Sequence, residues 1–168
     1  SSVLSSGRWY KISIKESGIY QISYSQLKSW GFQDPSRVRI YGYGGALLPE
    51  TYSTNDIDDL PQIPIVHNNN RIIFYGQGTV KWWFDNKSNT MKQRQNTYAN
   101  EGCYFITESD VEQASTTPAY IYETPSEELV EIYDGYSLHE QELASMSRTG
   151  QMFFGEDFRY TQTRNFSF

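Results

Sequence analysis

The chain has 168 residues, a formal net charge of −6 and an aromatic content of 16%. This length is enough for one domain with a hydrophobic core, and the scattered basic residues exclude a binder of nucleic-acid backbones, which needs clustered Lys and Arg. No apolar run reaches the length of a membrane span, and the single cysteine, Cys103, excludes an internal disulfide and a multi-cysteine metal site.

Two strands are predicted near the N-terminus, because apolar and polar residues alternate over 9–16 and again over 19–24. The short turn at Glu16-Ser17-Gly18 favours an antiparallel hairpin between them. A short helix is expected next, over 26–30. Ser25 would cap its start, and a left-handed Gly31 would end it.

Further strands are predicted between turn-rich segments, over 38–43, 63–66, 71–75, 80–85 and 102–107. Prolines flank 63–66, which favours a position at a sheet edge. The strand over 80–85 is apolar on both faces, so we expect it to be central or to form half of an interface. Residues 86–100 show no period and predict a long loop.

These elements predict a mainly β fold, an antiparallel β-sandwich or barrel-like domain with one or two short helices. We expect this module to occupy residues 1–125. The pattern changes at Ser126, and residues 126–168 are expected to be a partly helical linker followed by the truncated start of a next β-domain.

A glycine-rich turn at Gly42–Gly45 ends the strand predicted over 38–43, and the run Gly76-Gln77-Gly78 nearly repeats it. The turn at Gly42–Gly45 lacks part of the Gly-x-Gly-x-x-Gly motif that binds dinucleotides. Its third glycine would fall at Leu47, and Leu48-Pro49 follows where a helix N-terminus would have to receive the phosphate. We therefore interpret it as a tight strand-end turn.

Three further groups of side chains suggest chemistry, each with a structural alternative. The metal candidates are the calcium-type carboxylates of Asp56, Asp58 and Asp59, whose alternative is a solvated acidic loop. Cys103 and His67 could form a thiolate–imidazolium dyad, but a cysteine within an apolar strand is usually buried and inert. No catalytic residue and no cofactor are predicted from these groups.

The aromatic surplus is the stronger signal for binding. The candidate binding residues are Trp82, Trp83, Tyr43, Phe153 and Phe154. Exposed aromatic rings suit a carbohydrate-binding platform or the surface that packs against a neighbouring domain, and the structural alternative is a core with partly buried tyrosines.

Several short runs occur in a recognisable order: Trp9-Tyr10-Lys11-Ile12, Gly18-Ile19-Tyr20, Asp34-Pro35-Ser36, Val38-Arg39-Ile40-Tyr41-Gly42-Tyr43-Gly44-Gly45, Leu48-Pro49-Glu50, Phe74-Tyr75-Gly76-Gln77-Gly78, Leu138-His139-Glu140 and Phe154-Gly155-Glu156. In these runs the chain resembles the N-terminal region of the type IX secretion sortases of Bacteroidetes. That family consists of gingipain-like cysteine peptidases at the outer surface, which trim C-terminal signals from secreted cargo and attach the cargo to a surface lipopolysaccharide.

The resemblance implies a non-catalytic module, because the family's catalytic Cys and His lie in a later domain and Cys103 does not match the nucleophile. It implies docking on the catalytic domain that follows in the same polypeptide, with secretion machinery or cargo as further partners. It also implies a location that is secreted or at the outer-membrane surface of a Gram-negative bacterium. The alternative function is a carbohydrate- or lipopolysaccharide-binding β-module.

Overall fold

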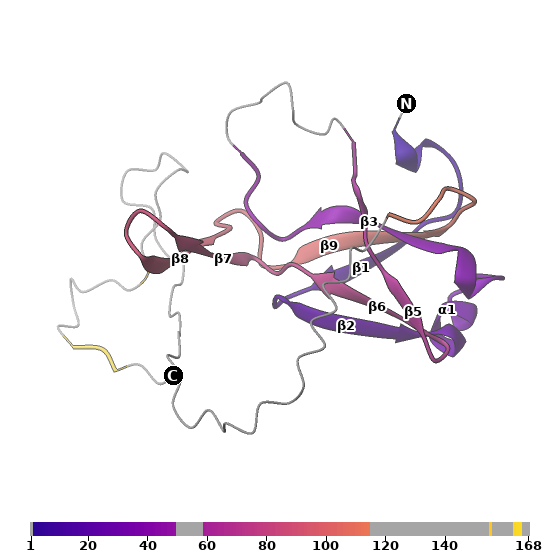
Figure 1. Ribbon diagram of the computed structural model, residues 1–168, viewed down its shortest axis with the longest axis horizontal. Helices are drawn as coiled ribbons and strands as arrows, with labels where there is room; N and C mark the ends of the chain where they lie inside the picture. Colours follow the sequence, from indigo (N-terminus) through magenta and orange to yellow (C-terminus); the bar gives the residue numbers. More distant parts are fainter. Residues whose placement is uncertain (1, 50–58, 115–154, 156–162, 166–168) are drawn as a thin grey trace. The chain divides into compact units, whose positions relative to one another are not determined.

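The computed structural model describes residues 2–49, 59–114, 155 and 163–165. The described elements are η1 (Val3–Ser5), β1 (Tyr10–Ile14), β2 (Gly18–Ser23), α1 (Tyr24–Ser29), η2 (Pro35–Arg37), β3 (Val38–Gly44), β4 (Gln62–Ile63), β5 (Val66–Asn68), β6 (Arg71–Gly76), β7 (Val80–Asp85), β8 (Thr90–Gln95) and β9 (Gly102–Glu108) (Figure 1). The predicted fold class is confirmed: the protein is mainly antiparallel β, consistent with a β-sandwich.

Three antiparallel sheets contain these strands. The first sheet has the order β1-β9-β3-β4, the second β2-β6-β5, and the third is the β7-β8 pair. One hydrophobic core joins the first two sheets, since Ile40 and Ile106 of the first are buried in the same cluster as Ile72 and Phe74 of the second. The helix α1 adds Leu27, which is fully buried.

The predicted hairpin between the first two strands is wrong. Tyr10 of β1 pairs with Ile106 of β9, whereas Ile19 of β2 pairs with Tyr75 of β6, so the two strands lie in different sheets. Alternation specifies which face of a strand is buried but not which strand lies beside it. The turn between them is bound elsewhere, because the Ser17 hydroxyl accepts a hydrogen bond of 2.9 Å from the Gly78 amide.

The single strand predicted over 63–66 is two strands at the edges of two sheets. β4 pairs with β3 in the first sheet, and β5 pairs with β6 in the second. The chain crosses between the sheets at Pro64-Ile65, where the Ile65 side chain enters the core. The predicted edge position is therefore confirmed for both short strands.

The helix α1 begins earlier than predicted. The Ser23 hydroxyl, and not that of Ser25, accepts the hydrogen bond from the Gln26 amide at 3.2 Å that caps its first turn. The end of the helix is as predicted, since Gly31 follows the C-cap residue Trp30 with a φ of 94°.

The predicted long loop over 86–100 contains the strand β8, which pairs with β7 along its whole length. The strand β7 is therefore not central, because in the described part of the chain its only strand partner is β8. Residues 1–117 form one compact unit and 118–168 a second one. The predicted domain boundary after residue 125 lies outside the described residues and stays a prediction.

Candidate interaction surface

Six glycines meet where β3 and β6 end and β9 begins, and we call this place the glycine junction: Gly42, Gly44, Gly45, Gly76, Gly78 and Gly102. At Gly45, a Cβ would lie 2.8 Å from the Gly78 carbonyl carbon and 2.9 Å from Gly102 Cα. Gly44 also has a φ of 72°, a backbone conformation that residues with a Cβ rarely adopt. Only glycine lets these backbones approach so closely.

Hydrogen bonds complete the glycine junction. The Gly45 amide donates to the Gln77 carbonyl at 2.9 Å, and the Gln77 amide donates to the buried Tyr104 hydroxyl at 3.0 Å. The Asn96 side-chain amide donates to the Gly45 carbonyl at 2.9 Å. The glycine-rich segment therefore has the packing role of a tight strand-end turn.

The β7–β8 hairpin starts directly from this junction. Gln77 Nε2 donates to the Ser17 hydroxyl and to the Val80 carbonyl, both at 2.9 Å. On the other strand, the Asn96 amide donates to the Thr79 carbonyl at 2.8 Å. Hydrogen bonds thus hold both strands where the hairpin begins. Beyond that point, the alternation of side chains along each strand decides on which face of the hairpin a residue lies.

The two faces of the hairpin differ in chemistry. In the cross-strand register, Lys81 lies opposite Arg94 and Trp83 opposite Lys92, so these four side chains share one face, the cationic face. Trp82 lies opposite Gln93 and Phe84 opposite Met91 on the other, apolar face. The predicted binding residues Trp82 and Trp83 are 37% and 41% exposed, but as neighbours along a strand they point to opposite faces and cannot form one flat platform.

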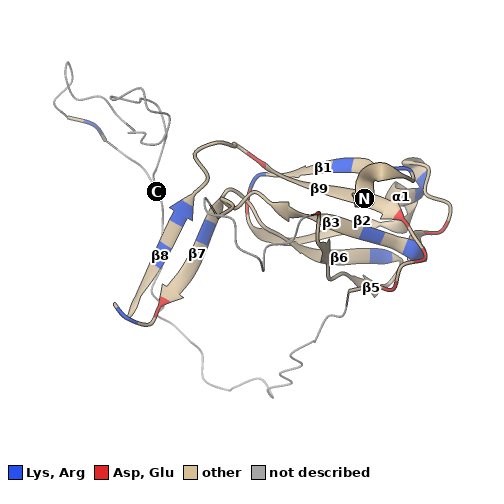
Figure 2. Cartoon of the chain, turned by 90° about the horizontal axis from the view of Figure 1, so that it is seen from above, with Lys and Arg blue, Asp and Glu red and all other residues tan. Residues whose placement is uncertain are grey.

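A small cavity of about 300 Å³ lies on the cationic face, lined by Leu47, Lys81, Trp83 and Arg94; we call it the cation pocket. Figure 2 shows the Lys and Arg residues of β7 and β8 in blue. Further along the same face, Lys92 forms an ion pair with Asp85. This bond to Lys92, followed by those to the Ser88 hydroxyl and the Lys87 amide, holds the pKa of Asp85 below its usual value.

A second, apolar surface lies on the β2-β6-β5 sheet. Ile19 and Tyr75 are cross-strand neighbours with 73% and 53% of their surface exposed, and Val66 pairs with Ile73 beside them. With Tyr43 and Ile63 they line an apolar groove of about 520 Å³. Among the described candidates, Tyr43 and Trp83 thus line different cavities.

The remaining predicted residues have structural partners or lie outside the described residues. The Asp59 carboxylate accepts hydrogen bonds from the Leu60 amide at 2.8 Å, the Val3 amide and the Ser2 hydroxyl, and the bond from Leu60 is the largest cause of its lowered pKa. Among residues 2–49 and 59–114, no three potential ligands form a metal-binding group. The side chains that lie outside the described residues are Asp56, Asp58, Phe153 and Phe154.

The structure does not bring Cys103 and His67 together. Cys103 lies on β9 of the first sheet, opposite Ser13 of β1. His67 lies on β5 of the second sheet, where its Nδ1 and the Tyr24 hydroxyl share a hydrogen bond of 2.7 Å. No hydrogen bond joins the thiol to the imidazole, so the geometry gives no support to the dyad.

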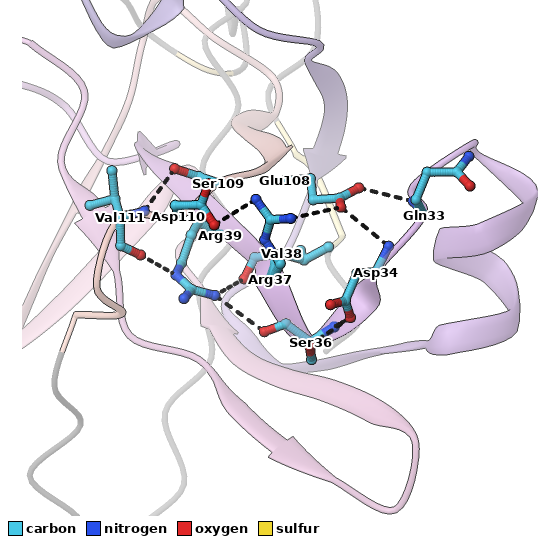
Figure 3. A network of polar contacts seen from close by, with 10 residues as sticks. All are labelled: Gln33, Asp34, Ser36, Arg37, Val38, Arg39, Glu108, Ser109, Asp110 and Val111. Carbon is cyan, nitrogen blue, oxygen red and sulfur yellow. Dashed lines mark hydrogen bonds and ion pairs between the residues drawn. The ribbon is translucent and has the colours of Figure 1, made fainter.

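A polar network that the sequence did not indicate surrounds the end of β9 (Figure 3). The Glu108 carboxylate accepts hydrogen bonds from the Gln33 and Asp34 amides at 2.9 and 3.3 Å. Arg37 pairs with Asp110 at 2.6 Å, and Arg39 Nε donates to the Val111 carbonyl at 2.9 Å. This network, which we call the polar clasp, holds residues 108–111 at the end of β9 against the segment 33–39.

Comparisons with known proteins give one informative result. No family model matches the chain, and no curated protein does. Among solved structures, the crystal structure of dimeric latent PorU from Porphyromonas gingivalis matches with a TM-score of 0.77 and 39% sequence identity. The match covers 97% of this chain and 15% of the PorU chain, so the chain is similar to a domain-sized region of PorU and spans a small part of its length. Within the described residues, no helix is long and apolar enough to span a membrane.

Proposed function

We propose that this chain is a non-catalytic N-terminal module of a type IX secretion sortase, and that it docks on the catalytic part of the same polypeptide. The observation that carries this proposal is the 39% identity to PorU, which extends over 97% of the chain but covers only 15% of PorU. A match of this kind is expected when one module of a larger protein corresponds to the whole chain.

The surface of the module supports a role in docking. Large apolar side chains are exposed on two separate elements, Ile19 and Tyr75 on the β2-β6-β5 sheet and Phe84 on the hairpin. Contiguous exposed apolar surface marks interaction sites in soluble proteins. The Cys103–His67 pair gives no support to a competing enzymatic function, since His67 is bonded to Tyr24 and not to Cys103.

We further infer a location at the cell surface or in the cell envelope, where the type IX secretion sortases that the chain resembles act. The proposed arrangement keeps residues 1–125 as the module and residues 126–168 as the linker and the start of the next β-domain. Secretion machinery and cargo are additional partners in this proposal.

The test uses PorU from which the region matching this chain has been deleted. The purified chain is added in trans, and complex formation is measured by size-exclusion chromatography. We expect the two to co-elute, with the PorU region itself as the positive control, and we expect the chain alone to hydrolyse no peptide. The proposal is contradicted if the PorU region binds but this chain does not, or if the chain alone shows peptidase activity.

A further inference from the structure

The strand β2 lies at the edge of the second sheet. In the order β2-β6-β5 it has β6 on one side, and within residues 2–49 and 59–114 no strand lies on its other side. Its six residues pair with β6 from Gly18 to Ser23 without a shift of register. The backbone N–H and C=O groups on the other side of β2 therefore have no strand partner in the described part of the chain. We call this row of backbone groups the β2 edge.

The other edge strands among the described residues have features that discourage pairing with a further strand. Natural sheets use charges, prolines, bulges or very short strands for this purpose. β4 and β5 have only two and three residues, β1 carries Lys11, and β7 and β8 carry Lys81 and Lys92. β2 has the sequence Gly-Ile-Tyr-Gln-Ile-Ser, with no charge, no proline and no bulge. An edge of this length without such a feature is a template for another strand.

The side chains of β2 leave apolar surface for that strand to cover. Tyr20 and Ile22 share one face, pack against the core and are only partly buried. Ile19 lies on the opposite face and is 73% exposed. A Cβ at Gly18 would have no atom within 4 Å, so the start of the strand is open. An added strand with apolar residues at alternate positions would therefore extend the burial of Tyr20 and Ile22.

The surroundings differ between the two ends of β2. At one end, Ile19 lines the apolar groove described above. At the other end lies a cavity of about 500 Å³, and the polar side chains in its lining include those of Gln21, Ser23, Gln26, Asn69 and Asn70. Carboxamide groups both donate and accept hydrogen bonds, as peptide groups do. The ligand that matches both ends is an extended polypeptide, apolar beside Ile19 and polar beyond Gln21.

We propose that the β2 edge accepts an extended segment of the sortase polypeptide outside this chain, which pairs with β2 as a further strand of the sheet. The inference rests on the proposed docking function and names the surface and the mode of that docking. The length of polypeptide outside this region supports the choice of occupant, because the chain corresponds to only 15% of PorU. A second copy of the chain fits less well, since two chains with a net charge of −6 repel each other.

The first experiment measures the fluorescence anisotropy of a short fluorescein-labelled peptide of alternating Thr and Ile residues, titrated with the full chain. We expect saturable binding that Ile19→Lys weakens about tenfold or more, because a lysine on an edge strand discourages pairing. The matched control is Val66→Lys, which places the same residue on the same face of the sheet but on its opposite edge, and it should leave the affinity within about twofold. The same peptide with proline at its central positions should not bind, because proline donates no backbone hydrogen bond.

Two results of this titration overturn the inference. One is the absence of peptide binding to the wild type. The other is an equal loss of affinity in Ile19→Lys and Val66→Lys, which assigns the peptide to the apolar face of the sheet. Size-exclusion chromatography of the chain alone tests the occupant: a dimeric wild type and a monomeric Ile19→Lys would overturn the proposed partner and assign the β2 edge to a second copy.

The second experiment measures amide hydrogen exchange of the chain with and without PorU lacking the matching region. We expect slower exchange over residues 18–23 in the complex, because strand pairing gives the outward amides hydrogen-bond partners. Co-elution without this protection overturns the inference and leaves the proposed docking intact. If the peptide binds as expected but the chain does not co-elute with the truncated PorU, the proposed docking fails, and the β2 edge stands as a strand-accepting site for a separate polypeptide.

Discussion

Replacing Gly102 by Ala tests whether the glycine junction holds the sandwich together by close backbone packing. The new Cβ would lie 2.7 Å from both the Gly44 carbonyl carbon and Gly45 Cα, and closer still to the Gly45 nitrogen. Ordinary van der Waals contacts of a Cβ are 3.4–4 Å, so β9 and the end of β3 must separate.

The expected destabilisation has two contributions. Overpacking in a well-packed interior costs about 1–3 kcal/mol. The separation also disturbs the hydrogen bond from the Gly45 amide to the Gln77 carbonyl, and leaving a buried donor unpaired costs about 1–3 kcal/mol. Together, Gly102→Ala should lower the free energy of unfolding by about 2–6 kcal/mol, which for a unit of this size corresponds to a Tm lower by about 8–24 °C.

The assay is urea-induced and thermal unfolding of the full chain, followed by circular dichroism and tryptophan fluorescence. The matched control is Gly18→Ala, because Gly18 also lies in a strand but a Cβ there would meet nothing within 4 Å. That variant should change the free energy of unfolding by less than about 1 kcal/mol. If Gly102→Ala unfolds at the same urea concentration as Gly18→Ala, close backbone packing at the glycine junction does not require glycine at position 102.

Three further predictions concern the core and its polar groups. Leu27→Ala should lower the free energy of unfolding by about 2–5 kcal/mol in urea titrations, because Leu27 is fully buried in the core cluster. Tyr104→Phe should cost about 1–3 kcal/mol in the same titrations, because it leaves the Gln77 amide without its acceptor. Burial, and next the charge of Arg39, lowers the pKa of His67 below that of an unfolded histidine, so the unfolded chain binds the proton more readily. The free energy of unfolding should therefore fall as the pH drops below about 6.5, by at most about 1.4 kcal/mol per pH unit. His67→Gln should flatten this pH dependence in urea titrations between pH 5 and 7. An unchanged slope would contradict the assignment of the pH dependence to His67.

The sequence was sufficient to predict the fold class and most strands, because a strand that buries one face shows an alternating pattern. β1 and β2 both show it, and both were predicted. Their partners could not be predicted in the same way, because β1 pairs with β9 and β2 with β6, and nothing in an alternating pattern records a partner so distant in the chain.

The strand β8 was missed for the opposite reason. It buries little against the core, and Met91 is its one apolar residue, so its two faces, with Lys92 and Arg94 on one and Gln93 and Gln95 on the other, show no apolar period. The polar clasp could not be predicted either, since Arg37 and Glu108 are brought together only by the pairing of β3 with β9.

The candidate surface was predictable in part. The exposed Trp82 and Trp83 were named from composition, and the alternation of side chains along a strand already places them on opposite faces. What the sequence could not supply is the position of Arg94 opposite Lys81, which depends on the register of a strand that was expected to be a loop.

The pairing of β1 with β9 has a consequence for how the chain acquires its structure. Tyr10 lies beside Ile106, and β9 also separates β1 from β3, so the first sheet has no centre until the last described strand is present. β1 therefore cannot find its strand partner until the chain is available as far as residue 108. Sheets closed by such distant pairings fold slowly, because the entropy of the long intervening segment is lost before any contact compensates for it. The first sheet is therefore completed late, whereas the β2-β6-β5 sheet uses only residues 18–76 and does not depend on β9.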